Sequence, residues 1–291
     1  MDLTATVLDF WAAPGSPTPT RTFTAGDAVV GFLSFDHVRT MGTGGLQEVV
    51  AVPARFFVQV PRGRSQREAA GLLLAGCTAW QQVVETEVRE GMRVLVYGAS
   101  GGCGSFAVQM VRHVVGEKGV VVAVCSGRNE ETVRGLGANE VVDYTRYTGD
   151  LAGELARRYG ETPFDVIIDG WGNQTLFNHC AGFLKPEGVY NTASIHYSGF
   201  TGWPVIVAAL KLIWNVIRPK SAWLGGTGRS WMTATMLDPG VEFMDQVVAL
   251  FAEGKIRVVV DSEWSFEQVH EAYDVLISGR ARGKVVVKIA E

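Results

Sequence analysis

The 291-residue chain lacks several features that would assign it to common protein classes. Its four cysteines never form a C-x-x-C pair, which argues against a disulfide framework and a structural zinc cluster and favours a reducing compartment. It has no excess of positive charge, because its formal net charge is −4, so we expect no nucleic-acid partner. No secretory signal is visible, so we expect a cytoplasmic protein. No set of Cys and His residues has metal-site spacing, so we expect no bound metal.

The chain also lacks an apolar run long enough to cross a bilayer. Its most apolar segment, residues 205–217, is interrupted by Lys211 and Asn215. It is shorter than the roughly 20 residues that a spanning helix needs. We therefore expect no membrane span.

Glycine, by contrast, is abundant at 35 residues, and its most informative cluster follows the apolar stretch Arg93-Val-Leu-Val-Tyr97. Gly98, Gly101 and Gly104 fit G-x-x-G-x-x-G, with Gly102 added, and apolar positions at helical spacing come next. This pattern predicts a strand, a tight turn and a helix. The turn lets the backbone approach a pyrophosphate, whose charge lies at the N-terminus of the helix.

The next apolar run, residues 119–124, predicts a strand buried on both faces. It ends about 20 residues after the glycines, where a dinucleotide domain binds the adenosine ribose. An acidic residue there would repel a 2′-phosphate, and none is present. Ser126, Arg128 and Asn129 instead offer donors and one positive charge, so we expect NADP(H) as the cofactor. The alternative is that Arg128 is an ordinary surface residue and Asn129 only caps the next helix.

Helices and strands continue to alternate after the glycine cluster. The patterns predict helices over 131–136, 151–159 and 174–184, and strands over 140–142, 164–169 and 188–192. This alternation predicts an α/β fold with a doubly wound parallel Rossmann sheet, whose ligand lies over the carboxyl ends of the strands. Gly170 and Trp171 follow one such end, and Ala193 and Ser194 follow another, so we expect these four to contact the nicotinamide.

The patterns predict four segments. Residues 1–25, with prolines at 14, 17 and 19, predict an irregular N-terminal arm. Residues 26–64 predict a small β-domain of short strands, one of them over 44–53. Residues 65–255 predict the Rossmann domain with a linking helix, which begins at a capping box of Ser65 and Glu68. Residues 256–291 predict a C-terminal segment with strands over 256–260 and 284–289.

The segment from Trp203 to Trp231 is unusual, because it holds four of the eight tryptophans and a narrow polar stripe of Lys211, Asn215 and Arg218 on an otherwise apolar helix. We expect it to cover an apolar pocket or a subunit contact, with Trp203 and Trp231 contacting substrate. The alternative is an ordinary core helix with aromatic filler.

Several motifs occur in an order that resembles one family. They are Gly26-Asp-x-Val-x-Gly31, Ala75-Gly-x-Thr78-Ala-Trp, Gly98-Ala-Ser-Gly-Gly-x-Gly104, Leu136-Gly-Ala138 with Val142-Asp-Tyr144, and Gly279-Arg-x-Arg-Gly-Lys284. From Gly26 onward the chain resembles the zinc-free quinone oxidoreductase and enoyl reductase branch of the medium-chain dehydrogenase/reductase superfamily. The resemblance implies hydride transfer from NADPH to the β-carbon of an enone or quinone, in a cleft between a Rossmann domain and a GroES-like domain.

The same resemblance implies roles for particular residues. It implies phosphate contacts from the turn at Ser100 to Cys103, and it places Ser126, Arg128 and Tyr144 around the 2′-phosphate and ribose. It places Thr78 beside the nicotinamide, returns the strand through Lys284 to the β-domain, and implies a homodimer formed through the Rossmann sheet edge. Family members carry a longer segment before the G-D-x-V-x-G turn, so we expect a shortened, truncated GroES-like domain.

We therefore expect an NADPH-dependent reductase of a small apolar substrate, either a polarised alkene or a quinone. The developing enolate oxygen needs a hydrogen-bond donor, and Thr78, Ser194, His196 and Tyr197 are the candidates. The alternative is that Thr78 only caps a helix turn and that His196 and Tyr197 lie on a surface loop. Two further hypotheses remain: a redox-silent descendant that isomerises, dehydrates or cyclises a bulky apolar substrate, and a non-catalytic NADPH-binding scaffold.

Overall fold

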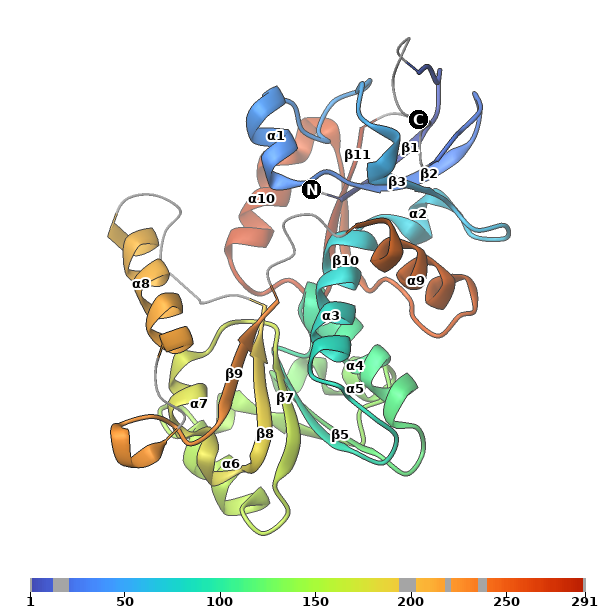
Figure 1. The fold of residues 1–291 in the computed structure, drawn as a ribbon. Helices are drawn as coiled ribbons and strands as arrows, with labels where there is room; N and C mark the ends of the chain where they lie inside the picture. The colour runs from blue at the N-terminus through green and yellow to red at the C-terminus, as the bar shows by residue number, and fades with distance from the viewer. Residues whose placement is uncertain (1, 13–20, 194–202, 218–220, 235–239, 290–291) are drawn as a thin grey trace. The chain divides into compact units, whose positions relative to one another are not determined.

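The computed structural model describes residues 2–12, 21–193, 203–217, 221–234 and 240–289. The chain forms two compact units: the parallel-sheet unit, residues 79–235, and the antiparallel-sheet unit, residues 1–78 with 236–291 (Figure 1). The domain boundaries expected at residues 25, 64 and 255 remain predictions. No helix in the described ranges combines the length and apolar character that crossing a membrane requires.

The parallel-sheet unit contains a six-stranded sheet in the order β6-β5-β4-β7-β8-β9, and every neighbouring pair is parallel. Its strands are β4 (Arg93–Tyr97), β5 (Val120–Cys125), β6 (Glu140–Asp143), β7 (Phe164–Asp169), β8 (Leu184–Thr192) and β9 (Ser230–Thr233). The chain reverses its direction of travel across the sheet between β4 and β7. This confirms the doubly wound α/β fold and puts a topological switch point at the end of β4.

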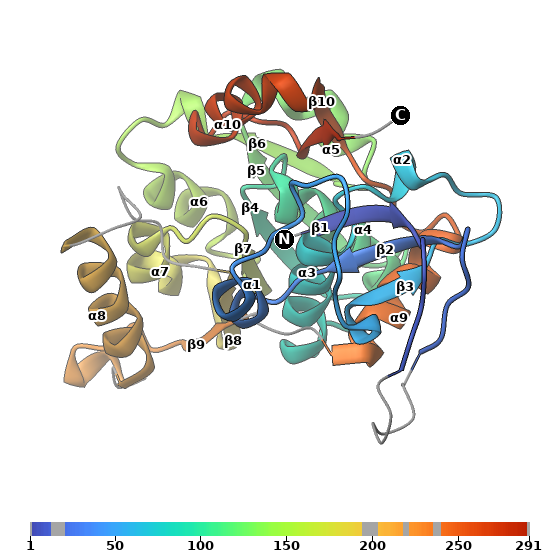
Figure 2. The same ribbon diagram turned by 90° about the horizontal axis from the view of Figure 1, so that it is seen from above.

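Helices cover both faces of this sheet (Figure 2). Helices α4 (Gly102–Val115) and α5 (Glu130–Arg134) lie on one face, and α6 (Leu151–Tyr159) and α7 (Gln174–His179) lie on the other. Helix α8 (Trp203–Ile217) precedes β9, and α3 (Leu73–Glu85) leads into the unit. Short 3-10 turns complete the connections at Gly127–Asn129, Tyr144–Arg146, Cys180–Gly182 and Ala222–Leu224.

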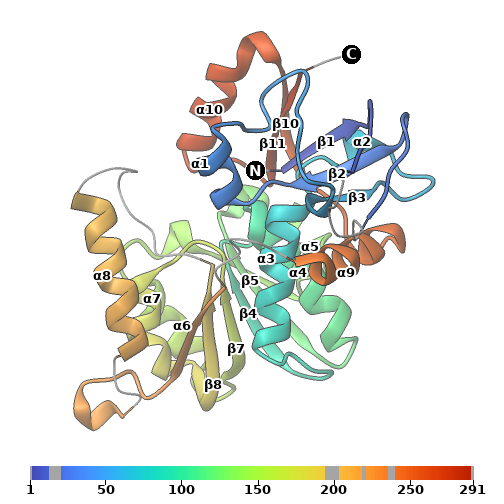
Figure 3. The same cartoon turned by 45° about the horizontal axis from the view of Figure 1, so that its top comes forward.

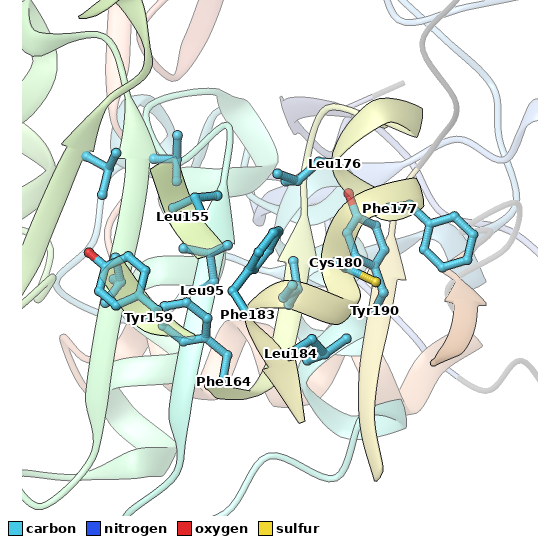
Figure 4. Close-up of a cluster of buried hydrophobic side chains, with 14 residues drawn as sticks. Leu95, Leu155, Tyr159, Phe164, Leu176, Phe177, Cys180, Phe183, Leu184 and Tyr190 are labelled. Carbon is cyan, nitrogen blue, oxygen red and sulfur yellow. The ribbon is translucent and has the colours of Figure 1, made fainter. Parts of the chain in front are cut away.

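The core of this unit follows from the two-residue period of the strands. Leu95 of β4 and Val122 of β5 belong to one buried cluster with Leu155 of α6 and Phe177 of α7. Figure 4 labels Leu95, Leu155 and Phe177 among the side chains of this cluster. Val94 and Val96 have the opposite orientation and are also fully buried. Burial on both faces explains the uninterrupted apolar runs, and each such side chain contributes roughly 1.5–3 kcal/mol.

The antiparallel-sheet unit is smaller and mixed. Its three-stranded antiparallel sheet has the order β1-β2-β3, and two further strands, β10 and β11, pair in parallel. The Lys284 ammonium of β11 lies 3.2 Å from the Asp2 carboxylate of β1. Its elements are β1 (Asp2–Thr6), β2 (Ala28–Phe32), β3 (Phe57–Gln59), β10 (Val260–Ser265), β11 (Lys284–Lys288), α1 (Phe35–Met41), α2 (Gln66–Ala69), α9 (Gly240–Ala252) and α10 (Val269–Ile277), with 3-10 turns at Ala54–Phe56 and Phe266–Gln268.

The structure differs from the sequence patterns in this unit. Residues 1–25, expected to be irregular, contain β1, because Asp2–Thr6 pairs along the whole length of β2. Residues 44–53 form no strand, and the exposure of Val49 shows that this apolar run lacks the burial that stabilises a strand. The strand expected over 256–260 begins only at Val260. The capping box of Ser65 and Glu68 is confirmed.

Candidate functional site

The glycine turn, residues 98–104, joins β4 to α4 at the switch point (Figure 3). Gly98 has φ +71°, in the left-handed region that favours glycine, and Gly101 is the N-cap of α4. The Ala99 N–H donates to the Val124 carbonyl of β5 at 3.1 Å, and the Gly101 N–H donates to Gly98 at 2.9 Å. These bonds hold the turn in one conformation.

Close backbone packing explains the third glycine. A β-carbon on Gly104 would collide with the carbonyl group of Gly98, so no larger residue fits at this position. Gly170 also lies close to this turn, since a β-carbon added to Gly170 would lie 3.3 Å from the Gly104 nitrogen. The first N–H groups of a helix have no partner within it, and the helix dipole adds positive charge there. The turn is therefore a cradle that suits a pyrophosphate.

The tip of β5 is tied to this cradle by one buried amide. Asn129 Nδ2 donates to Ser100 Oγ at 2.9 Å and to Ser126 Oγ at 3.2 Å. Asn129 is 6% exposed and makes no side-chain cap bond to α5, so its amide bridges the turn and the strand tip. Three residues predicted from the sequence thus lie together, and the exposed Arg128 belongs to the same 3-10 turn.

Asp143, at the end of β6, was not predicted as a site residue. A β-carbon on Gly127 would lie 2.5 Å from its Oδ2, so this carboxylate packs against the tip of β5. Burial would raise the pKa of Asp143, but hydrogen bonds from Thr145 and Gly127 and the charge of Arg146 hold it below its usual value. Tyr144, the next residue, is 45% exposed. Pairing of β5 with β6 was the signal that could have identified Asp143, because adjacent parallel strands end at one edge.

A buried carboxylate organises the loop after β7. Asp169 accepts hydrogen bonds from the N–H groups of Trp171, Gly172 and Asn173 at 2.6–2.9 Å, and from the Tyr190 hydroxyl at 2.6 Å. Burial raises the pKa of Asp169, although these hydrogen bonds lower it. The loop lies against the glycine turn, because a β-carbon added to Gly98 would lie 3.4 Å from the Trp171 β-carbon.

Further polar groups lie at the same edge of the sheet. The Ala193 N–H donates to the Asp169 carbonyl at 2.9 Å, which places Ala193 beside Gly170 and Trp171. Gln82 of α3 is fully buried, donates to Asn191 Oδ1 at 3.2 Å and accepts from the Cys103 thiol at 3.6 Å. Asn191 Nδ2 is buried and has no hydrogen-bond partner among the described residues. Sequence reasoning missed Gln82 and Asn191, since neither belongs to a motif.

The remaining predicted residues are less closely grouped. Thr78 lies in the antiparallel-sheet unit and its hydroxyl donates to the Leu74 carbonyl at 2.7 Å. Trp203 is exposed on α8, whereas Trp231 packs on the core with its ring centroid 6.3 Å from that of Phe177. Ser194, His196 and Tyr197 lie outside the described residues.

The described residues also bear on metal binding. They include no group of three or more His, Cys, Asp or Glu side chains that could hold a metal ion. No disulfide bond joins any two of the four cysteines, and burial raises the pKa of Cys125 to about 11, which disfavours its thiolate.

The chain is similar to known reductases. The family model of zinc-binding dehydrogenases matches residues 136–287. A medium chain reductase of Acremonium sp. is 32% identical over 96% of this chain and 78% of its own length. A trans-enoyl reductase of Penicillium oxalicum is 34% identical over 77% of this chain, and the match spans 57% of that protein. A solved mycobacterial structure complexed with NADPH has a TM-score of 0.73 at 21% identity, covering 99% of this chain and 81% of that one, and shares the fold.

Proposed function

The chain belongs to the zinc-binding dehydrogenase family, within the medium-chain reductases, and from that premise we propose that it is an NADPH-dependent reductase of a polarised alkene or a quinone. The names of the two relatives, a medium chain reductase and a trans-enoyl reductase, support this proposal. The proposed substrate is a small apolar molecule with a C=C bond conjugated to a carbonyl group. The expected homodimer is part of the proposal, and light scattering on the purified chain tests it.

The cradle at the start of α4 is the observation that carries the proposal. Gly98 supplies the left-handed turn and Gly104 the close approach, so the N–H groups from Gly102 onward can reach an anion. The buried Asn191 Nδ2 is a donor without a partner among the described residues at the same edge of the sheet. Both features fit a nicotinamide dinucleotide, whose pyrophosphate needs N–H donors and whose carboxamide needs donors and acceptors.

Selection of NADPH over NADH is proposed to rest on Arg128, beside Ser126 and Asn129. A guanidinium can pair with two of the three terminal oxygens of a 2′-phosphate, whereas a free hydroxyl gains little from it. Asp143 opposes this selection in part, because its carboxylate packs against the same strand tip. Its charge is already shared with Arg146 and the hydrogen bonds of Thr145, which supports net selection for NADPH.

The bound nicotinamide would supply a hydride to the β-carbon, and the electrons of the C=C bond would then place negative charge on the carbonyl oxygen. That charge is lost when the α-carbon takes a proton. The chain's own part is to orient the substrate, exclude water and donate a hydrogen bond to that oxygen. Asp169 would fix the loop of Gly170 and Trp171 as one wall of the pocket. Ser194, His196 and Tyr197 are the proposed donors. Thr78 is less suited, because its hydroxyl proton is used by Leu74.

The cofactor assignment is tested by Arg128→Ala. We expect NADPH binding to weaken by roughly 1.5–3 kcal/mol, about tenfold to 150-fold, with NADH binding nearly unchanged. Fluorescence titration with both cofactors measures this. Arg134→Ala is the matched control, because Arg134 pairs with Glu130 on the neighbouring α5. Equal losses for NADPH and NADH would contradict the 2′-phosphate assignment.

The reaction is tested by incubating the chain with NADPH and a panel of enones and quinones, while cofactor absorbance and product mass are followed together. We expect one NADPH oxidised for each product that gains two hydrogens. A product formed without loss of NADPH would favour the non-redox isomerisation or cyclisation instead. Tight NADPH binding with no product from any substrate would favour the non-catalytic scaffold.

A further inference from the structure

Helix α8 exposes a face of large apolar side chains. Ile206, Leu210, Ile213 and Ile217 recur every three or four residues, so they lie on one face, and they are 49–64% exposed. Asn215, on the other side, is 5% exposed. Its amide exchanges two hydrogen bonds with the Gln174 amide of α7, at 3.1 and 2.8 Å. A surface helix ordinarily buries its apolar face, so this arrangement calls for an apolar environment outside the unit.

Tryptophans extend this exposed face. Trp203 begins α8, Trp214 lies near its end, and Trp223 in the following 3-10 turn is 90% exposed. We name these side chains together the α8 patch: Trp203, Ile206, Leu210, Ile213, Trp214, Ile217, Trp223 and Leu224. Figures 1 and 3 show α8 beyond α7, with no other described helix of residues 79–235 over its outer side. Tryptophan is typical of membrane–water interfaces, where its ring is buried and its N–H stays hydrated.

A groove adjoins the patch. It lies between α7 and α8, has a volume of about 710 Å³, and has Leu210, Ile213 and Trp214 among its walls. Lys211 and the amide of Asn178 also line it. An apolar groove with a cationic group on its wall suits a lipid, whose acyl chain needs apolar contact and whose headgroup carries negative charge.

The charge of the surrounding sequence identifies the occupant. Residues 188–237 contain no Asp or Glu and four cations, Lys211, Arg218, Lys220 and Arg229, in a chain whose formal net charge is −4. Of these, Lys211 lines the groove, whereas the Arg229 guanidinium donates to main-chain carbonyls. Two copies meeting face to face through α8 would bring their Lys211 side chains together, whereas the homodimer proposed above would form through the sheet edge. An anionic surface would instead be attracted to this region, with each cation near the surface contributing on the order of a threefold to tenfold gain in affinity.

We propose that the α8 patch binds the surface of membranes that contain anionic lipids, with α8 lying in the plane of the interface. The tryptophans would lie at headgroup level, and the apolar stripe of α8 would enter the acyl boundary. This inference goes beyond the proposed reductase function and does not depend on it, because it concerns a different surface and requires no cofactor.

Vesicle flotation with the full chain tests the proposal. We expect binding to phosphatidylcholine vesicles that contain about 30% phosphatidylserine, weaker binding without phosphatidylserine, and weaker binding at high salt. Ile213→Asp should reduce binding at least about tenfold, because it puts a charge into the stripe. The matched control is Ile277→Asp, since Ile277 is 71% exposed on α10, outside the patch, and it should bind as the unchanged chain does.

Circular dichroism on the same samples shows whether each variant is folded, and NADPH titration tests the reductase proposal separately from membrane binding. Lys211→Glu gives a second variant that leaves the apolar stripe intact. The proposal is overturned if the unchanged chain binds neither vesicle, or if Ile213→Asp binds as well as the control. It is also overturned if light scattering shows a dimer that Ile213→Asp converts to a monomer, because the patch is then a contact between copies.

Discussion

The glycine turn and α8 belong to the same compact unit and use their residues in opposite ways. Around the turn, Val94, Leu95 and Val96 are fully buried, and the chain contacts its neighbours through backbone atoms at Gly98 and Gly104. Along α8 the large apolar side chains are exposed, and a polar pair, Asn215 with Gln174, holds the helix to α7. In the glycine turn the contacts are made by backbone atoms, and no side chain blocks them. In α8 the exposed face consists of side chains that make few packing contacts.

This difference predicts how each region responds to substitution. A single added methyl group at the turn must displace backbone, so it should affect stability and cofactor binding together. A side chain removed from the exposed apolar face of α8 leaves no cavity, so it should affect neither, although it changes the surface that the protein presents. The predictions below test this contrast, from the largest expected effect to the smallest.

Among the substitutions at the site, the largest combined effect on stability and cofactor binding is expected from Gly104→Ala. Its β-carbon collides with the Gly98 carbonyl, so the turn must open, and we expect a loss of about 1–3 kcal/mol in the free energy of unfolding. NADPH and NADH should both bind at least about tenfold more weakly, about 1.4 kcal/mol, since the N–H groups of the cradle are displaced. Urea unfolding and fluorescence titration measure the two effects.

Gly135→Ala is the control for this substitution. Gly135 has φ −65°, and the nearest neighbour of a β-carbon there would be the Thr132 carbonyl oxygen at 3.4 Å, an ordinary contact distance, so alanine fits without strain. We expect no loss of cofactor affinity. A loss as large as that of Gly104→Ala would mean that glycines in this unit matter for a reason other than close approach.

Asp169→Asn comes next. The carboxylate accepts bonds from three N–H groups and the Tyr190 hydroxyl, and an amide offers only one oxygen for them. We expect the free energy of unfolding to fall by about 1.5–3 kcal/mol, since buried hydrogen bonds to a charged group are lost. Tyr190→Phe removes only one of these bonds and should cost less. If both variants unfold like the unchanged chain in urea, Asp169 does not hold the loop.

A smaller effect is expected from Asn129→Ala. It removes the bonds to Ser100 and Ser126, so the turn and the tip of β5 lose their bridge, at about 0.5–1.5 kcal/mol for each bond. Because the bridge positions both parts of the site, NADPH and NADH should weaken to a similar degree. Arg128→Ala should weaken NADPH alone. A selective loss of NADPH in Asn129→Ala would instead indicate direct contact with the 2′-phosphate.

Most strands and helices of the parallel-sheet unit were predictable, because their signals are local, but β9 was not predicted and the helix expected over 174–184 ends at His179. β7 and α6 lie where the apolar periods put them, over Phe164–Asp169 and Leu151–Tyr159. The antiparallel-sheet unit was predicted less well, because β1 depends on a partner 22 to 30 residues along the chain, with Thr6 opposite Ala28 at the near end and Asp2 opposite Phe32 at the far end. Composition around the nearby prolines gave no sign of that pairing.

The site shows the same division. The glycines and the donors Ser126 and Asn129 could be found from one motif and its spacing. Gln82 and Asn191 could not, since neither belongs to a motif and their positions depend on how α3 packs on the sheet. Asp143 belongs to a quoted motif, but its place at the tip of β5 depends on the pairing of β5 with β6. The outward orientation of α8 was also unpredictable, because a sequence period shows that a helix has an apolar face without showing which way that face points.

The smallest effect is expected from Leu210→Ala on α8, and Leu95→Ala in β4 provides the contrast with the same chemical change. Leu95 is fully buried between two helices and the neighbouring strands, so its truncation should cost about 2–5 kcal/mol. Leu210 is 56% exposed and alanine favours helix, so its truncation should change the free energy of unfolding by less than about 0.5 kcal/mol. Urea unfolding of both variants measures the difference. A cost near that of Leu95→Ala would show that α8 is packed in solution against apolar surface of this chain, and the contrast between the two regions would then disappear.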